Sequence, residues 1–274
     1  MSSFSRSAKL DISEAYRAKW FFLYCIVFAG IMAVLLLSGV TESRVLGFTG
    51  ISRVVMTFVQ LCMLIVPLFV LVSTVRSVAG DREAGVYEYL LSFPVGLKSW
   101  YFGKIFGKFL VLTTPVILAL IGAALWALMK GLSLPWWQLG ISIVLLISLT
   151  WCFIGIGMLL STYIRSADLA QGAAFALWLV LLLFLDLILI GLLISNQFSV
   201  EGIVLIAILN PLQTFRTGTM LLFDPQLMLL GPTANVIFDW FGSSYLFIAI
   251  FYPFGLGMLA ILVGYRKFIN SDLI

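Results

Sequence analysis

Few side chains in this sequence of 274 residues could carry acid–base, nucleophilic or metal chemistry. Histidine is absent, which removes the commonest transition-metal ligand and the side chain that titrates nearest neutral pH. The three cysteines, Cys25, Cys62 and Cys152, lie far apart in apolar stretches, so they form neither a disulfide framework nor a Cys-x-x-Cys metal site. We therefore expect no catalytic residue, no cofactor site and no metal site in this chain.

The segment from Gly103 to Lys108 is the nearest approach to a phosphate-binding loop. Three residues separate its glycines where the loop needs four, and Phe109 follows the lysine where Mg²⁺ needs a hydroxyl. A nucleotide site is therefore not expected here. The spacing of Gly103 and Gly107 instead permits close packing of a second helix.

Asp186 is an acidic residue inside an otherwise apolar run, and an intramembrane carboxylate is a functional candidate by default. It lies 18 residues after Asp168, which is about 27 Å along a helix, against an apolar core of about 30 Å. We therefore place it near the outer interface. Two roles stay open: pairing with a group of the following segment, residues 195–239, such as Arg216, or contact with cargo or a proton.

The elements that position these residues must be membrane helices. The chain is 62% hydrophobic and 10% charged, with a mean hydropathy of +1.16. A soluble domain has about 45–50% apolar and about 25% charged residues. Because one span needs about 20 residues, the length allows about six spans with loops and leaves no room for a separate ATPase domain.

Charge-free windows predict six spans and an all-α integral membrane fold. Charge-free windows lie between Lys19 and Glu42, Arg53 and Arg76, and Lys108 and Lys130, then over about 136–163, and between Asp239 and Arg266. The fifth span starts after Asp168, and its apolar run over 173–194 is interrupted only by Asp186. With the N-terminus inside, the inner segments hold 12 Lys and Arg residues and the outer segments hold 4. The positive-inside rule therefore places both termini in the cytoplasm.

Residues 1–19 predict a cytoplasmic helix that lies in the membrane interface before the first span. Ala8, Ile12, Tyr16 and Trp20 recur every four residues, while charged residues take the other faces.

Residues 81–94 predict a short amphipathic helix on the same side. Asp81 is expected to cap it, Glu83 to lie in its first turn, and Pro94 to end it. Val86, Leu90 and Phe93 form an apolar edge. From these residues alone, a solvated loop and a helix that docks a partner protein are both open.

Residues 195–239 form a long outer segment between the fifth and sixth spans. Its apolar pieces are too short to cross a bilayer and are broken at Asn210-Pro211, Asp224-Pro225 and Gly231-Pro232. We therefore expect re-entrant or interfacial helices here.

Taken together, these features resemble the ABC-2 permeases, and within them the NosY-type permeases that serve nitrous oxide reductase maturation. The likeness covers residues 1–274 as a single ABC-2 type transmembrane domain. It is carried by Ala8-Lys9-Leu10, Arg17 and Trp20, Leu46-Gly47-Phe48-Thr49, Gly80-Asp81-x-Glu83-x-Gly85, Leu90-Leu91 and Pro94, Gly103-Lys104, Phe184-Leu185-Asp186-Leu187, and Leu209-Asn210-Pro211 with Arg216. Val86 departs from the family pattern, in which many members have Thr.

The resemblance implies a non-catalytic subunit of the inner, cytoplasmic membrane. A second copy of the chain would form a homodimer on a dimer of a NosF-like ABC ATPase, which binds ATP and Mg²⁺. A periplasmic NosD-like protein would lie on the outer face; the lipid bilayer is the other partner, and no nucleic acid is expected. The implied ATPase-coupling residues are Asp81, Arg82, Glu83, Gly85, Leu90 and Pro94, and the implied outer contacts are Asn210, Pro211 and Arg216.

The implied function is to couple ATP hydrolysis to export, or to conformational work on a periplasmic partner, in copper-site maturation. One alternative is an ABC-2 exporter of a lipid, drug or peptide. A secondary transporter is an alternative from another class, although the sequence shows a single intramembrane acid and no internal repeat.

The charge count gives a testable topology. In intact cells, Lys98→Cys and Lys267→Cys should be shielded from an impermeant thiol reagent, whereas Glu42→Cys and Gln226→Cys should be labelled. The native thiols should react slowly because they lie within spans. Labelling of Lys98→Cys from outside would reverse the orientation.

Overall fold

The computed structural model describes residues 3–17, 19–38, 50–88, 96–195, 198–223 and 232–270. These ranges consist of helices joined by turns and short loops, and they contain no strand. The helices are α1 (Ser3–Arg17), α2 (Trp20–Leu37), α3 (Ile51–Thr74), α4 (Arg76–Glu83), α6 (Leu97–Met129), α7 (Trp136–Tyr163), α8 (Ala167–Leu179), the π-helix η2 (Val180–Phe184), α9 (Leu185–Ser195), α10 (Val200–Leu209), α11 (Pro211–Phe223), α12 (Pro232–Trp240), the 3₁₀-helix η4 (Gly242–Ser244) and α13 (Tyr245–Ile269).

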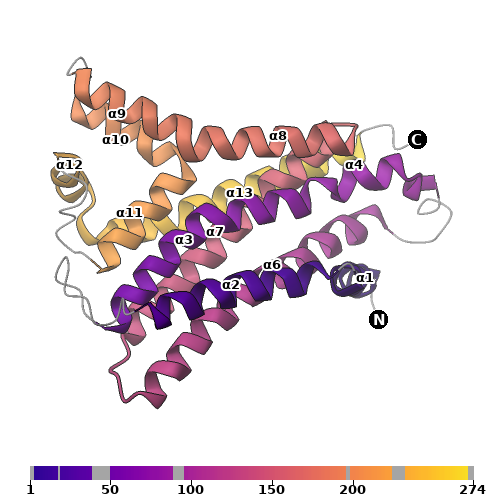
Figure 1. Cartoon of the computed structure of the whole chain (residues 1–274). Helices are drawn as coiled ribbons and strands as arrows, with labels where there is room; N and C mark the ends of the chain where they lie inside the picture. Colours follow the sequence, from indigo (N-terminus) through magenta and orange to yellow (C-terminus); the bar gives the residue numbers. More distant parts are fainter. Residues whose placement is uncertain are drawn as a thin grey trace.

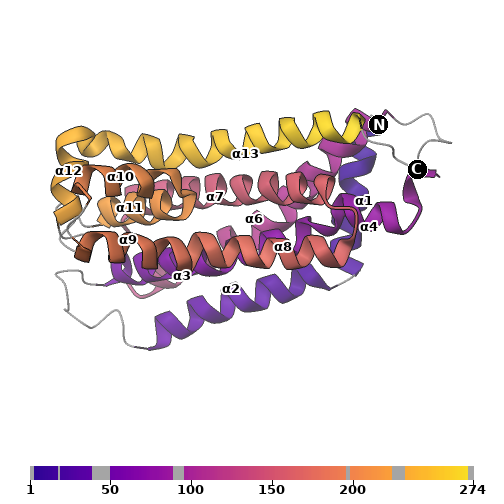
Figure 2. The same cartoon turned by 90° about the horizontal axis from the view of Figure 1, so that it is seen from above.

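Six helical stretches of the described chain are long and apolar enough to cross a membrane, which confirms the six expected spans. They are Trp20–Leu37, Ile51–Glu83, Leu97–Met129, Trp136–Tyr163, Ala167–Ser195 and Gly242–Ile269. α1, α4 and the last turns of α13 lie at one end of the bundle, which we call the α1 end, and α10 and α12 lie at the other, the α12 end (Figures 1 and 2). The charge count predicts which side of the membrane each end faces, with the α1 end in the cytoplasm.

The core of the bundle is built around α7, which packs against α3, α11 and α13. Small residues permit the closest approach, since a Cβ added at Gly155 of α7 would lie 2.2 Å from the carbonyl oxygen of Gly257 in α13. The fifth span lies at the edge of the bundle, and no side chain of η2 or α9 is buried. Its apolar surface is therefore left for lipid or for another chain.

The helix expected over residues 1–19 is present as α1, which lies crosswise to the spans over one end of α6 (Figure 1). Gly103 and Gly107 of α6 make the close contact that their spacing allows. A Cβ added at Gly103 would lie 2.7 Å from Ser7 Cβ, and one at Gly107 would lie 2.9 Å from the carbonyl oxygen of Ala8. The side chains that α1 buries against α6 include the polar Ser7 and Asp11, which the apolar repeat did not predict.

The expectation that a helix begins at Asp81 is wrong. The helix that contains Asp81 is α4, which begins at Arg76 directly after α3 and ends at Glu83. The break between α3 and α4 at Val75 is stabilised from another span, because Ser161 Oγ of α7 accepts hydrogen bonds from the backbone N–H groups of Val78 (2.8 Å) and Ala79 (3.1 Å). Burial of this first part of α4 against the bundle therefore decided where the helix begins, not the capping preference of Asp81.

After Glu83 the chain turns at Gly85, whose φ of +67° favours glycine. Residues 86–88 then make one further helical turn. Leu90, Phe93 and Pro94 lie outside the described residues, as does the predicted end of the helix at Pro94.

The described part of the outer segment contains three short helices, and the boundary between the first two is the expected one. α10 ends at Leu209, and α11 runs from Pro211 to Phe223. Every side chain of α11 except Gln213 and Arg216 is buried, against α3, α7 and α13. The turn predicted at Asp224-Pro225 lies outside the described residues, and α12 begins at Pro232 as the third turn predicts.

The glycine contact between α1 and α6 can be tested with a matched pair of substitutions. Gly107→Val should destabilise the protein by about 1–3 kcal/mol, because the new side chain meets the backbone of α1. Thermal unfolding in detergent measures this change, and faster trypsin cleavage at Arg17 or Lys19 reports the displacement of α1. Gly122→Val is the control, because it makes the same change on α6 where no atom lies within 4 Å of the added Cβ. Equal losses in the two variants would contradict the docking of α1 on Gly107.

Candidate functional site

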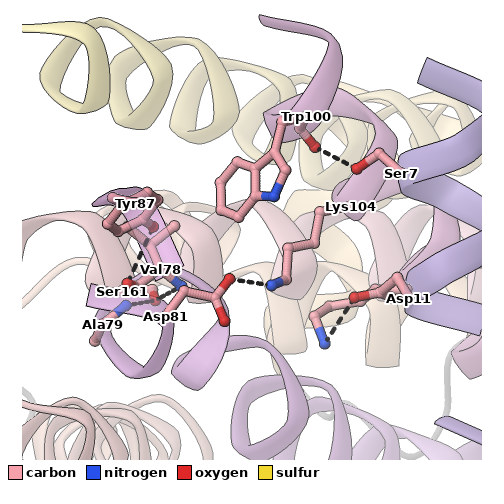
Figure 3. A network of polar contacts seen from close by, with 10 residues as sticks. Ser7, Asp11, Val78, Ala79, Asp81, Tyr87, Trp100, Lys104 and Ser161 are labelled. Carbon is pink, nitrogen blue, oxygen red and sulfur yellow. Dashed lines mark hydrogen bonds and ion pairs between the residues drawn. The ribbon is translucent and has the colours of Figure 1, made fainter. Parts of the chain in front are cut away.

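Two lysines one turn apart on α6 form the centre of a polar network at the α1 end (Figure 3). Lys104 Nζ donates to the carboxylate of Asp81 in α4 and lies 4.9 Å from the centre of the Trp100 ring. Lys108 Nζ lies 3.6 Å from Asp11 Oδ1 in α1. We call these five residues the lysine cluster. Because like charges at this spacing repel each other on a helix, each lysine is stabilised by the carboxylate that another helix supplies.

The two ion pairs of the lysine cluster are largely removed from water. The side chains of Lys104, Lys108 and Asp11 are 12%, 17% and 6% exposed. Burial raises the pKa of the Asp11 carboxyl, although the charges of Lys108 and Lys104 oppose this shift. Desolvation therefore outweighs the attraction at Asp11, so the packing of α1 on the glycines of α6 must hold this pair together.

The side chain of Tyr87 anchors the turn after α4 to the rest of the bundle. Its hydroxyl donates to the carbonyl oxygen of Val78 at 3.1 Å. Its ring lies 5.5 Å from the ring of Trp100 in α6 and 5.7 Å from that of Phe268 in α13. The helical spacing of Val86, Leu90 and Phe93 gave no sign of this role, since Tyr87 is not on the apolar edge that these residues predict.

Glu83 connects the end of α4 to the start of the fifth span. Its Oε1 accepts a hydrogen bond from the backbone N–H of Ala167, the first residue of α8, at 3.0 Å. A carboxylate at this position satisfies an amide that has no partner within the helix and interacts favourably with the helix dipole. Glu83 therefore has a partner within the chain. A residue that served only to bind an ATPase would instead face solvent or the docked protein.

The structure places the expected coupling residues in different environments. Asp81 is bound to Lys104, Arg82 is half-buried, Glu83 contacts α8, and Gly85 forms the turn. The exposed side chains of the turn are those of Glu83, Ala84 and Glu88. We call residues 82–88 the α4 turn. Leu90 and Pro94 lie outside the described residues.

A second polar site lies at the α12 end, where Asp186 in α9 meets two side chains of α11. Gln213 Nε2 donates to Asp186 Oδ1, and Arg216 Nη1 lies 3.3 Å from Asp186 Oδ2. Gln213 and Arg216 are three residues apart and so share one face of α11. Of the two roles left open for Asp186, the structure therefore shows the pairing with Arg216.

The backbone next to Asp186 is irregular. Residues Val180–Phe184 form the π-helix η2, and a π-turn in an α-helix is rare and often occurs at functional sites. Asn210 Nδ2 donates to the carbonyl oxygen of Leu181 at 2.7 Å, while Asn210 Oδ1 accepts from the N–H of Leu212 at 3.0 Å. Asn210 thus joins the turn between α10 and α11 to the π-helix.

Asn210 and Pro211 were expected to contact an outer partner, but the structure buries both side chains within the chain. Asn210 makes the hydrogen bonds of the turn, and Pro211 is the first residue of α11, a position that does not need its missing N–H group. We therefore assign both residues to the internal turn. Arg216 differs, because 40% of its side chain is exposed beside Asp186.

Comparison with known proteins assigns the family. Residues 6–272 match the ABC-2 family transporter proteins, so the chain belongs to this family. It is similar to a probable ABC transporter permease protein NosY of Stutzerimonas stutzeri, with 27% identity over 215 residues, 76% of this chain and 78% of the relative. It is also similar to a probable ABC transporter permease protein NosY of Pseudomonas aeruginosa, with 24% identity over 225 residues, 79% of this chain and 81% of the relative.

The pair of Arg216 and Asp186 can be tested by a double-mutant cycle. Arg216→Ala should lower the stability of the isolated subunit by about 1–2 kcal/mol, because it leaves a partly buried carboxylate with one partner fewer. Asp186→Asn should restore part of this loss in the double variant. Thermal unfolding in detergent is the measurement. Lys130→Ala removes an exposed cation outside the pair and is the control. Strictly additive losses would show that the two side chains are not coupled.

Proposed function

We propose that this ABC-2 transporter protein is the permease subunit that receives conformational work from a separate ABC ATPase at its α4 turn. The proposal is supported by the contacts that attach α4 and the turn after it to the bundle. α4 continues α3, Asp81 is paired with α6, Glu83 with α8, and Tyr87 with α6 and α13. A displacement of the α4 turn would therefore be transmitted to four membrane spans together.

The α4 turn has an exposed part, which a partner protein can contact, and a buried part, which attaches the turn to the bundle. Ala84 and Glu88 are exposed, whereas Tyr87 between them is buried. A protein that binds the exposed side chains can thus move the buried anchor without having to open the bundle. The partner would bind the ATP and Mg²⁺, since this sequence lacks the spacing and the hydroxyl of a phosphate-binding loop.

The likeness to the NosY permeases supports a proposal for the partners and the cellular role of this chain. We propose a homodimer in the inner membrane with both termini in the cytoplasm, a NosF-like ATPase dimer at the α1 end, and a periplasmic NosD-like protein at the α12 end. The exposed apolar surface of the fifth span is available for contact with a second copy as well as with lipid. The cellular role would be export, or mechanical work on the outer partner, in copper-site maturation of nitrous oxide reductase.

Glu88 tests the docking of the ATPase more cleanly than Glu83. A charge reversal at Glu83 would also remove the hydrogen bond to Ala167, so its effect would mix docking with the packing of α8. Glu88→Lys reverses an exposed charge and should weaken co-purification of the ATPase about tenfold, with a matching loss of ATPase stimulation in proteoliposomes.

Glu201→Lys makes the same change at an exposed position at the α12 end and should leave both readouts unchanged. The copper content of nitrous oxide reductase in cells that carry each variant separately tests the proposed role in copper-site maturation. If Glu88→Lys retains wild-type capture and stimulation of the ATPase, the α4 turn is not the docking site.

A further inference from the structure

A pocket of about 290 Å³ opens at the α1 end among α1, α2, α3, α6 and the start of α8. Four charged side chains line it: Asp11 and Glu14 from α1, Arg76 from the start of α4, and Lys108 from α6. Its volume is at the lower limit of the range for small-molecule sites, which is about 300–1,000 Å³. It therefore suits a compact polar group and not a whole lipid molecule.

The pocket is polar toward the α1 end and apolar one helical turn deeper. On α6, Lys108 lies one turn before Leu112, and on α2, Trp20 lies one turn before Tyr24. The next span runs in the opposite direction, so Val72 lies one turn deeper than Arg76. The pairs on α6 and α3–α4 thus run from charged to apolar side chains, and Trp20 and Tyr24 of α2 are of the aromatic types that are enriched at the membrane interface, as a phospholipid requires near its headgroup.

The charges of the pocket select a headgroup of both signs. A simple anion would be repelled by Asp11 and Glu14, and a simple cation by Arg76 and Lys108. Arg76 is suited to a phosphate because its guanidinium can donate two parallel hydrogen bonds, and 56% of its side chain is exposed. Its contact with Asp168 is 3.4 Å long between exposed groups, so a phosphate can replace it.

We propose that this pocket binds the headgroup of a phosphatidylethanolamine-type phospholipid from the leaflet in which α1 lies. The phosphate contacts Arg76, the ammonium contacts Glu14, and the acyl chains leave the pocket along the apolar side near Tyr24 and Val72. The site is distinct from the ATPase contact of the proposed function. It nevertheless joins α1 to Arg76, the first residue of α4, so an occupied site stabilises the helix that carries the α4 turn.

Native mass spectrometry of the full chain tests this proposal. The protein is purified in detergent and incubated with equal amounts of phosphatidylethanolamine and phosphatidylglycerol. The wild type should retain phosphatidylethanolamine preferentially and should unfold at a higher temperature in its presence. Arg76→Gln should lower this retention about threefold to tenfold, because an exposed charge-assisted contact is lost.

Ala15→Phe is a second variant that fills the pocket without removing a charge, and it should abolish the preference. Arg165→Gln removes an exposed cation at the same end of the bundle outside the pocket and should bind like the wild type. Equal retention by the wild type and both pocket variants would overturn the proposal, as would a preference for phosphatidylglycerol. Stabilisation by soluble glycerophosphoethanolamine without any lipid retention would also overturn it, because the occupant would then come from solution.

Discussion

Two lysines on one face of α6 each need a carboxylate, and the architecture of the α1 end follows from how that need is met. Lys104 is paired with Asp81 of α4, and Lys108 with Asp11 of α1. Each carboxylate comes from another helix, so the two pairs join α4 and α1 to α6. They act beside other polar contacts, which are those of Ser161 with α4 and of Ser7 with the carbonyl oxygen of Trp100. Because the cost of removing these charges from water is high, the pairs persist only where close packing holds them, and the glycines of α6 provide it for α1.

The spans could be predicted from the sequence because a bilayer imposes one length and one composition on every helix that crosses it. Charge-free windows therefore located all six. The boundary between α10 and α11 could be predicted for a similar reason, since Pro211 ends any helix that precedes it. The start of the helix around Asp81 could not, because it depends on Ser161 of α7, which accepts hydrogen bonds from Val78 and Ala79.

The candidate sites were less predictable than the fold because their residues meet across the bundle. Asp186 and Arg216 could be identified as a possible pair, but the sequence does not state the distance between α9 and α11. The π-helix before Asp186 and its hydrogen bond to Asn210 had no signal in the sequence, since residues 180–184 are all apolar. Asn210 was expected to contact an outer partner but is buried in the turn between α10 and α11, which also depends on how the helices pack.

The two polar sites lie at opposite ends of a shared set of helices. α11, which carries Gln213 and Arg216, packs against α3, α7 and α13, and α3 and α13 are also attached to the α4 turn. Work applied at the α4 turn therefore has a continuous packed route to the α12 end. The proposed function requires that an ABC ATPase contacts this turn. A photoreactive amino acid in place of the exposed Ala84, in native membranes, tests it most directly. A covalent adduct with an ABC ATPase is expected from position 84, and none from position 201. An ATPase adduct from position 201 and none from position 84 would contradict it.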